Sequence, residues 1–337
     1  MEVFENYSLK KYNTFSIDVN CSYFVESDKK EDFLEFIKMY ELDPKKIVIL
    51  GGGSDFLFIG DFKGTVLYPT IMGKEIILEN EDYVDVRVGA GENWDDFVLW
   101  AVDRGYGGIE NLSLIPGNVG AAPVQNVGAY GMEAADIIES LEAIDIIKGK
   151  ETQISKSECE FSYRSSKFKG EWKNLYIITS VVFRLSKKPK FKLDYGKIRD
   201  EIASLGKSIS LTTIREAVIN IRESKLPDYK ILPNAGSFFK NPIVDKLLAD
   251  KLKQKYTDMP YYIMDEKNVK LAAGWMIESC GWKGKRVGNV GVYEKQSLVI
   301  INYGGASGMD IAKLSNDIKN SVLFKFGIML YPEVYVI

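Results

Sequence analysis

The sequence predicts a protein of the α+β class with two or three domains. Its 337 residues exceed what one typical hydrophobic core contains, so more than one domain is expected. Helical and strand periodicities alternate between residues 27 and 105, and strand-like segments dominate residues 135–190. Two of the early strands lead directly into glycine-rich turns. These patterns predict a chain that contains both helices and strands.

The first expected elements are a helix and a buried strand. Ser27 can cap a helix whose apolar residues, at 33, 36, 37 and 40, share one face. The apolar run at 46–50 predicts a buried strand, which ends at the turn Gly51-Gly52-Gly53-Ser54.

A second strand and helix follow. Val84, Val86 and Val88 alternate with polar residues, which predicts a half-buried strand that ends in Gly89-Ala90-Gly91. Apolar residues between 94 and 102 then have helical spacing, and Gly105 stands where such a helix would end. Further strands are expected at 141–147 and 176–185, with a turn at 148–150.

The second half of the chain contains two predicted helices. Thr213 and Glu216 form a possible capping box for a helix that Leu226-Pro227 would end, so we place a domain boundary near residue 226. Ser307 can start a second helix with Asp310 in its first turn, and the inward residues are 311, 314, 318 and 322. An apolar strand is expected at 328–337.

Composition excludes several classes of protein. With 46% hydrophobic and 27% charged residues and a net charge of -3, the chain reads as an ordinary globular protein without a nucleic-acid surface. No apolar run approaches a membrane span, and the acidic N-terminus lacks the features of a secretory signal. Three scattered cysteines suggest a reducing compartment rather than a disulfide framework or a metal site. We therefore expect a cytoplasmic protein.

Three glycine-rich segments indicate a ligand site. Residues 51–53 follow a strand, but Phe56 occupies the place of the third fingerprint glycine, so a Rossmann motif is excluded. Successive glycines can still form a nest of backbone N–H groups for phosphate. The long, uncharged segment 115–131 is better explained by a large ligand than by a simple connection. Each turn alone is more often structural, whereas the three together favour a nucleotide-like cofactor.

The stretch Asn234 to Pro242 presents Ser237 beside a glycine in a protein without histidine. A nucleophilic serine usually depends on a histidine base, so another role is required. Ser237 either bonds its own backbone in a turn or donates a proton to a strongly basic carbon.

Seven motifs, taken in order, resemble the UDP-N-acetylenolpyruvoylglucosamine reductases, flavoenzymes of bacterial peptidoglycan precursor synthesis. The resemblance covers essentially the whole chain, and Leu193-Asp194-Tyr195-Gly196 resembles the extra loop of the longer, type I subclass. The motifs are Asn13-Thr14-Phe15, Gly51-Gly52-Gly53-Ser54, Gly89-Ala90-Gly91-Glu92-Asn93-Trp94, the glycine-bearing segment from Ile115 to Gly131, Tyr163-Arg164, Gly236-Ser237-Phe238-Phe239-Lys240-Asn241-Pro242 and Tyr331-Pro332-Glu333-Val334.

The resemblance implies a fold and a reaction. Two α+β subdomains of the vanillyl-alcohol-oxidase (PCMH-type) fold, residues 1–67 and 68–225, would hold FAD without a covalent bond. The strand at 326–337 would return to the second subdomain, and residues 226–325 would form a separate substrate-binding domain. NADPH would supply hydride through FAD to the enolpyruvyl ether of a UDP-sugar, and the product would be UDP-N-acetylmuramate. We expect a monomer with no nucleic-acid, membrane or metal partner.

The resemblance also implies the site residues. Arg164 would bind the substrate carboxylate, Ser237 would protonate the carbanion, and Glu333 would act as a protonated donor. The expected cofactor residues are Gly51, Gly52, Gly53, Ser54, Asp55, Gly117, Gly120, Ala121, Ala122, Gln125, Asn126 and Gly128. The expected substrate residues are Tyr163, Tyr195, Lys225, Asn241 and Gln296.

The chain departs from the family at three places. Asp55 stands where the family usually has asparagine, which puts a negative charge near the expected FAD diphosphate. Ala121 and Ala122 replace residues that are often serine or glycine, so phosphate bonds there would come from backbone N–H groups alone. Tyr293 occupies the place of a common histidine.

Two other functions are compatible with these patterns. One is an FAD-dependent oxidase of the same fold that acts on another substrate. The other is a nucleotide-sugar binding protein without catalysis. Bleaching of a bound flavin by NADPH distinguishes the reductase from both.

Overall fold

The structure is a computed structural model that describes all residues from 1 to 337. The chain divides into two compact units, and each is built from three separate segments. Unit 1 comprises Met1–Tyr7, Cys21–Gly53 and Lys63–Arg222, and unit 2 comprises Ser8–Asn20, Ser54–Phe62 and Glu223–Ile337. The boundary after Arg222 lies close to the predicted boundary near 226.

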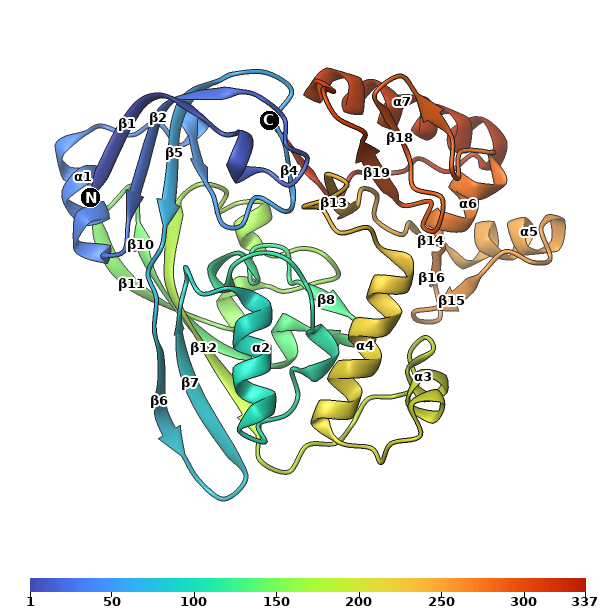
Figure 1. Ribbon diagram of the computed structural model, residues 1–337, viewed down its shortest axis with the longest axis horizontal. Helices are drawn as coiled ribbons and strands as arrows, with labels where there is room; N and C mark the ends of the chain where they lie inside the picture. The colour runs from blue at the N-terminus through green and yellow to red at the C-terminus, as the bar shows by residue number, and fades with distance from the viewer. The chain divides into compact units, whose positions relative to one another are not determined.

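Unit 1 begins with a four-stranded sheet in the order β1-β2-β5-β3 (Figure 1). Helix α1 (Lys30–Met39) packs on it through Phe33 and Phe36, as predicted. The predicted cap is wrong, because Lys29 occupies the N-cap position and Ser27 instead bonds Lys29 N–H and Asp32. The strands are β1 (Glu2–Ser8), β2 (Asn20–Ser27), β3 (Ile47–Ile49) and β5 (Phe62–Pro69).

The larger sheet of unit 1 is antiparallel and has the order β11-β10-β12-β7-β6. Helix α2 (Trp94–Asp103) covers it, and the rings of Trp94 and Phe183 lie 5.9 Å apart (Figure 1). The strand predicted as half-buried has its three valines buried, while Tyr83 and Arg87 on its other face are only partly covered and Asp85 is buried and paired with Arg184. The strands are β6 (Lys74–Glu79), β7 (Tyr83–Gly89), β10 (Ile138–Asp145), β11 (Lys150–Ser155) and β12 (Tyr176–Ser186).

Two helices and a short hairpin complete unit 1. Helices α3 (Ile198–Leu205) and α4 (Leu211–Lys225) share a small core of aliphatic residues. The Ser210 hydroxyl accepts the Thr213 N–H at 3.1 Å, so the cap of α4 lies three residues before the predicted one. The hairpin consists of β8 (Gly128–Ala129) and β9 (Met132–Glu133).

Unit 2 contains a four-stranded sheet in the order β13-β19-β18-β17 and a smaller sheet in the order β14-β16-β15. Helix α7 (Gly308–Phe326) starts at a capping box of Ser307 and Asp310, and its predicted inward residues are buried. Strands of the larger sheet are β13 (Asn234–Ser237), β17 (Arg286–Val287), β18 (Val290–Val292) and β19 (Val299–Asn302). The other elements are β14 (Ile243–Asp245), α5 (Lys246–Lys255), β15 (Tyr261–Ile263), β16 (Asn268–Leu271) and α6 (Ala273–Ser279).

The C-terminal segment differs from the prediction. Only β20 (Tyr335–Val336) is a strand, and it pairs in parallel with β4 (Phe56–Leu57). Both strands belong to unit 2, so this pairing lies outside residues 68–225, to which we expected the segment to return. The physical reason is that the one strand that pairs with β20 is β4, which lies in the same unit.

None of the helices combines the length and the apolar character that crossing a bilayer requires.

Candidate active site

The glycine segments of unit 1 meet at one place. A methyl group on Gly52 would lie 2.7 Å from the Cα atom of Gly117, so the two backbones are in direct contact. The Gly120 N–H donates to the Ala90 carbonyl at 2.9 Å, and the Asn118 side chain donates to the Gly91 carbonyl at 2.8 Å. Three turns that are distant in sequence therefore form a single backbone cradle.

The cradle has free donors at specific positions. The N–H groups of Gly51, Gly52, Gly53 and Gly117 form no hydrogen bond within the protein. By contrast, the Ala121 and Ala122 N–H groups donate to the carbonyls of Asn118 and Val119. The expectation that phosphate bonds come from the N–H groups at 121 and 122 is therefore not supported, because a helical turn uses them. The free glycine donors fit an anionic group such as a diphosphate.

The two predicted amide residues have different roles. The Asn126 side chain is 1% exposed, donates to Glu133 and to the Ser162 carbonyl, and accepts the Ala135 N–H. Its hydrogen-bonding capacity thus holds the loop together. Gln125 accepts a hydrogen bond from Lys169 through Oε1, which leaves its amide N–H groups to donate elsewhere.

Arg164 lies at the tip of a two-residue turn in unit 1. Ser162 and Ser165 exchange both backbone hydrogen bonds at 3.0 Å, and Arg164 has a φ of +52°. The guanidinium donates to the Gly128 carbonyl and lies 5.3 Å from the centre of the Tyr163 ring. Any side chain on Gly128 would collide with it, since a methyl group there would lie 2.9 Å from Nη1. Left-handed backbone at a non-glycine residue costs free energy and is concentrated at functional sites.

Tyr195 also belongs to unit 1 and is 49% exposed. Its loop packs on the turn at Tyr130 and Gly131, because a methyl group on Gly131 would lie 3.3 Å from the Tyr195 Cβ atom. The buried Asn111 amide donates to the carbonyls of both Tyr130 and Lys192 and so ties the two loops together. Sequence reasoning missed Asn111, which no local pattern marks.

Ser237 ends β13 in unit 2, directly after a bulge. The register with β19 shifts between Asn234 and Ser237, and Gly236 has a φ of +64°. The Asn234 side chain accepts the Gly236 N–H at 2.9 Å and donates to the Leu232 carbonyl. Bulges re-aim side chains next to active sites, so this turn positions the Ser237 hydroxyl. Asn234 was visible as the first residue of the serine-bearing stretch, but its role was not predicted.

Glu333 lies beside this turn. Its N–H donates to the Phe238 carbonyl at 2.8 Å, and Lys240 N–H donates to the Tyr331 carbonyl at 3.0 Å. Residues 238–240 and 331–333 therefore run as a short ladder that brings two predicted catalytic residues into neighbouring chain segments.

Two predicted substrate residues meet at the first turn of α6. The side-chain oxygen Oδ1 of Asn241 accepts the Ala273 N–H at 3.0 Å, and the side-chain oxygen Oε1 of Gln296 lies 3.3 Å from the position of a methyl group on Gly274. Gln296 also accepts the Leu298 N–H. Both side chains thus keep their amide N–H groups for a ligand. Lys225 is exposed at the end of α4.

The predicted cofactor residues are divided between the units. The boundary falls between Gly53 and Ser54, so Ser54 and Asp55 belong to unit 2. The Asp55 carbonyl accepts the Tyr335 N–H at 2.7 Å, which joins this segment to β20. Tyr293, which occupies the place of the common histidine, also lies in unit 2, and its backbone N–H donates to the Val299 carbonyl.

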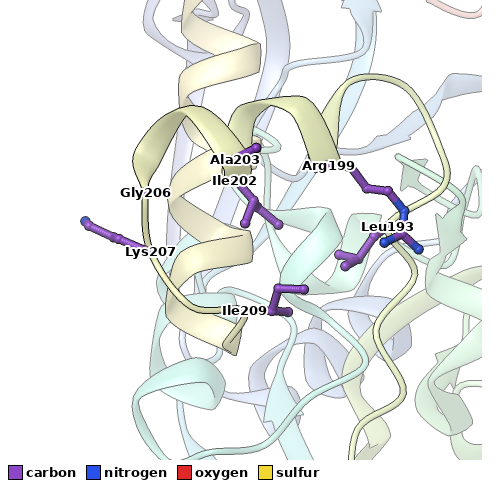
Figure 2. A pocket seen from close by; sticks show the side chains of 7 residues that line it. All are labelled: Leu193, Arg199, Ile202, Ala203, Gly206, Lys207 and Ile209. Carbon is purple, nitrogen blue, oxygen red and sulfur yellow. The ribbon is translucent and has the colours of Figure 1, made fainter.

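A cavity of 240 Å³ lies beside α3 and contains none of the predicted site residues (Figure 2). Its apolar floor includes Ile202 and Ile209, and its two basic residues are already paired, Arg199 with Asp194 and Lys207 with Glu216. The structure gives no sign that this cavity takes part in the predicted chemistry.

This chain is similar in sequence to known proteins over nearly its full length. Residues 227–337 match the family model of the C-terminal domain of UDP-N-acetylenolpyruvoylglucosamine reductase, and residues 21–155 match that of an FAD binding domain. The UDP-N-acetylenolpyruvoylglucosamine reductase of Bacteroides fragilis is 46% identical over 330 residues, which is 98% of each chain. The chain belongs to the UDP-N-acetylenolpyruvoylglucosamine reductase family.

Other reductases of this family are also similar to the chain in sequence or in fold. The Flavobacterium johnsoniae reductase is 46% identical over 341 residues and covers 100% of both chains. The crystal structure of the Thermus caldophilus reductase, at 23% identity, has a TM-score of 0.66 and covers 99% of this chain and 98% of that one. The predicted resemblance, the α+β class and the FAD-binding architecture are thereby confirmed.

Proposed function

We propose that this protein is an NADPH-dependent flavoenzyme that reduces the enolpyruvyl ether of UDP-N-acetylglucosamine-enolpyruvate to UDP-N-acetylmuramate. The observation that carries the proposal is the near-complete coverage by reductases of this name at 46% identity. The cradle of glycine backbone in unit 1 supports the proposal that the cofactor is FAD, because its free N–H groups fit a diphosphate.

FAD, when bound, would supply the hydride-transfer chemistry between NADPH and the substrate. The residues of the cradle, Gly51 to Gly53 and Gly117, would hold its diphosphate by backbone donation. Gln125 would offer its side-chain N–H groups to the cofactor, since its side-chain oxygen Oε1 already accepts a hydrogen bond from Lys169. The absence of histidine excludes the histidyl-flavin bond, and by resemblance to the family the cofactor would be held without a covalent link.

Arg164 would bind the substrate carboxylate. Hydride addition to the outer carbon of the double bond places negative charge on the carbon next to the carboxylate, and that charge spreads into the carboxylate. A preorganised guanidinium stabilises developing charge where it forms. The tight turn and the Gly128 contact fix the Arg164 side chain before substrate arrives. Tyr163 stacks on this guanidinium and would line the same part of the site.

Ser237 would supply the proton that completes the reduction. A hydroxyl is a weak acid toward water, yet it is adequate toward a carbanion-like carbon. The bulge at Gly236 and the Asn234 side chain hold the hydroxyl-bearing residue in place. Glu333, whose backbone N–H forms a hydrogen bond with the Phe238 carbonyl, would act as a protonated donor to the developing charge.

The remaining substrate contacts would be polar. The amide N–H groups of Asn241 and Gln296 and the ammonium group of Lys225 suit the oxygens of a diphosphate. Tyr195 would cover the substrate from its exposed loop.

Two half-reactions test the proposal. Purified protein reconstituted with FAD should lose its flavin absorbance on anaerobic addition of NADPH and regain it on addition of the enolpyruvyl UDP-sugar. Reoxidation by oxygen alone, with no effect of the UDP-sugar, would favour an oxidase. Protein that takes up no FAD would instead be a binding protein.

We also propose that the enzyme acts as a monomer in the cytoplasm. Its three cysteines are free thiols, which supports a reducing compartment. Light scattering of the purified protein and fractionation of cells test the two statements.

A further inference from the structure

Helix α4 carries two arginines that face a single half-buried carboxylate, that of Asp95. Arg215 and Arg222 are seven residues apart, so they lie on the same side of the helix. Arg215 pairs with both oxygens of Asp95 at 2.6 and 2.8 Å, and this ion pair joins α4 to α2, which lie side by side in Figure 1. Asp95 also accepts the Leu114 N–H at 2.5 Å. Three hydrogen bonds thus already hold this carboxylate, two at Oδ1 and one at Oδ2.

Arg222 has no direct ion-pair partner. Its guanidinium forms no hydrogen bond or ion pair, and its Nε atom is buried without a partner. Burial lowers the pKa of Arg222, while the Tyr130 hydroxyl and the Asp95 carboxylate oppose this shift. Two positive charges thus face one negative charge. Arg222 is half-buried, and a partly desolvated charge without a direct partner is costly, so an anion is expected to complete the group.

The surroundings of Arg222 lie on the substrate side of unit 1. Tyr130, which interacts electrostatically with Arg222, belongs to the turn that packs against the Tyr195 loop. The free donors of the glycine cradle are instead at residues 51–53 and 117. Lys225 follows three residues after Arg222 on α4, and residues at this spacing share a helix face.

We propose that Arg222 binds an anionic group of the UDP-sugar substrate. This group supplies the negative charge that Arg222 lacks within the protein. The inference rests on the proposed function. The anion is either the enolpyruvyl carboxylate or the UDP diphosphate, because a guanidinium recognises both in the same bidentate manner. The Asp95–Arg215 pair is a positioning element that keeps Arg222 available, since an unpaired Asp95 would neutralise it.

The test compares Arg222→Met and Arg222→Lys with the wild-type holoenzyme. Dissociation constants for the enolpyruvyl UDP-sugar, and for UDP-N-acetylglucosamine, which lacks the carboxylate, are measured by calorimetry. Arg222→Met should weaken binding of the enolpyruvyl substrate by roughly 10- to 100-fold, and Arg222→Lys by less. FAD content and bleaching by NADPH should not change. Weaker binding of both ligands identifies the diphosphate, whereas an effect on the enolpyruvyl compound alone identifies the carboxylate.

A second set of variants keeps the test informative if Arg222→Met folds poorly. Arg215→Met should weaken substrate binding, because the freed Asp95 would pair with Arg222. The double variant Asp95→Asn/Arg215→Met should restore it. Unchanged substrate affinity in Arg222→Met or in Arg215→Met would overturn the inference, as would a loss of FAD with normal substrate affinity. Wild-type protein that does not bind the UDP-sugar would instead refute the proposed function itself.

Discussion

The backbone N–H of Glu333 donates to the carbonyl of Phe238 at 2.8 Å. This bond joins the last chain segment to the residue that follows Ser237. It holds the proposed proton donor and the proposed acidic partner in one ladder of unit 2, whatever side chains surround them. The arrangement explains how a histidine-free chain can still fix an acid and a hydroxyl in neighbouring positions.

Gly52→Ala should impair FAD binding. The added methyl group would lie 2.7 Å from the Gly117 Cα atom and 2.9 Å from the Asn118 side chain, which forces the cradle apart. We expect the dissociation constant for FAD to rise by about 5- to 150-fold, since relieving such a backbone contact costs about 1–3 kcal/mol. Fluorescence titration of the apoprotein measures it. Gly60→Ala is the control, because a methyl group there meets nothing within 4 Å. Equal FAD affinity in both variants would refute the cradle.

Arg164→Lys should lower kcat/KM for the UDP-sugar by roughly 10- to 100-fold, because the charge remains but the bidentate fork is lost. Steady-state kinetics with NADPH measure the effect, and FAD content should stay normal. Arg199→Lys is the matched control, since Arg199 pairs with Asp194 at the surface. A variant at 164 that behaves like this control would speak against the carboxylate role.

Asp95→Asn should destabilise the protein in a pH-dependent way. Burial would raise the pKa of Asp95, but hydrogen bonds from Arg215 and Leu114 and the nearby positive charges outweigh burial, so the pKa lies below its ordinary value of 3.8. A lowered pKa stabilises the fold above 3.8, and this contribution disappears as the pH falls through the folded value. We expect a loss of about 3 kcal/mol at pH 7 that shrinks below pH 3.8. Urea unfolding at a series of pH values provides the measurement, and a constant difference would contradict the explanation.

The thiols should react in a fixed order. Burial raises the pKa of Cys21 to about 11 and that of Cys159 to about 12, whereas Cys280 is only partly buried. The thiolate is the reactive form, so Cys280 should be alkylated first in the native protein at pH 8. Mass spectrometry after brief iodoacetamide treatment identifies the site. Modification of Cys159 before Cys280 would show that the unit 1 core opens readily.

Amphipathic helices were predictable because one face of each packs on a sheet. The apolar stripes of α1, α2, α4 and α7 were visible in the sequence, and the capping box of α7 is present. The predicted caps at Ser27 and Thr213 were wrong, because Lys29 occupies the N-cap position of α1 and Ser210 caps α4. Helix α5 was missed, since its sequence is dominated by charge and only Ala249 and Leu252 are buried.

Long-range pairing could not be read from the sequence. The pairing of β20 with β4 and the ladder between Phe238 and Glu333 join segments that are far apart in the chain. The glycine cradle shows the same limit. Glycine content predicted a phosphate nest, but only the structure distinguishes the N–H groups at 51–53 from those at 121 and 122 that bond within the protein.

The most direct test of the account is rapid-mixing absorbance spectroscopy of the Ser237→Ala holoenzyme. NADPH should bleach the flavin at the wild-type rate, because the serine takes no part in that step. Reoxidation of the bleached flavin by the enolpyruvyl UDP-sugar should slow by about 10²- to 10⁴-fold, the usual contribution of a general acid. Ser204→Ala, an exposed serine on α3, should leave both steps unchanged. Equal slowing of both steps in Ser237→Ala, or no slowing of reoxidation, would contradict the role assigned to this hydroxyl.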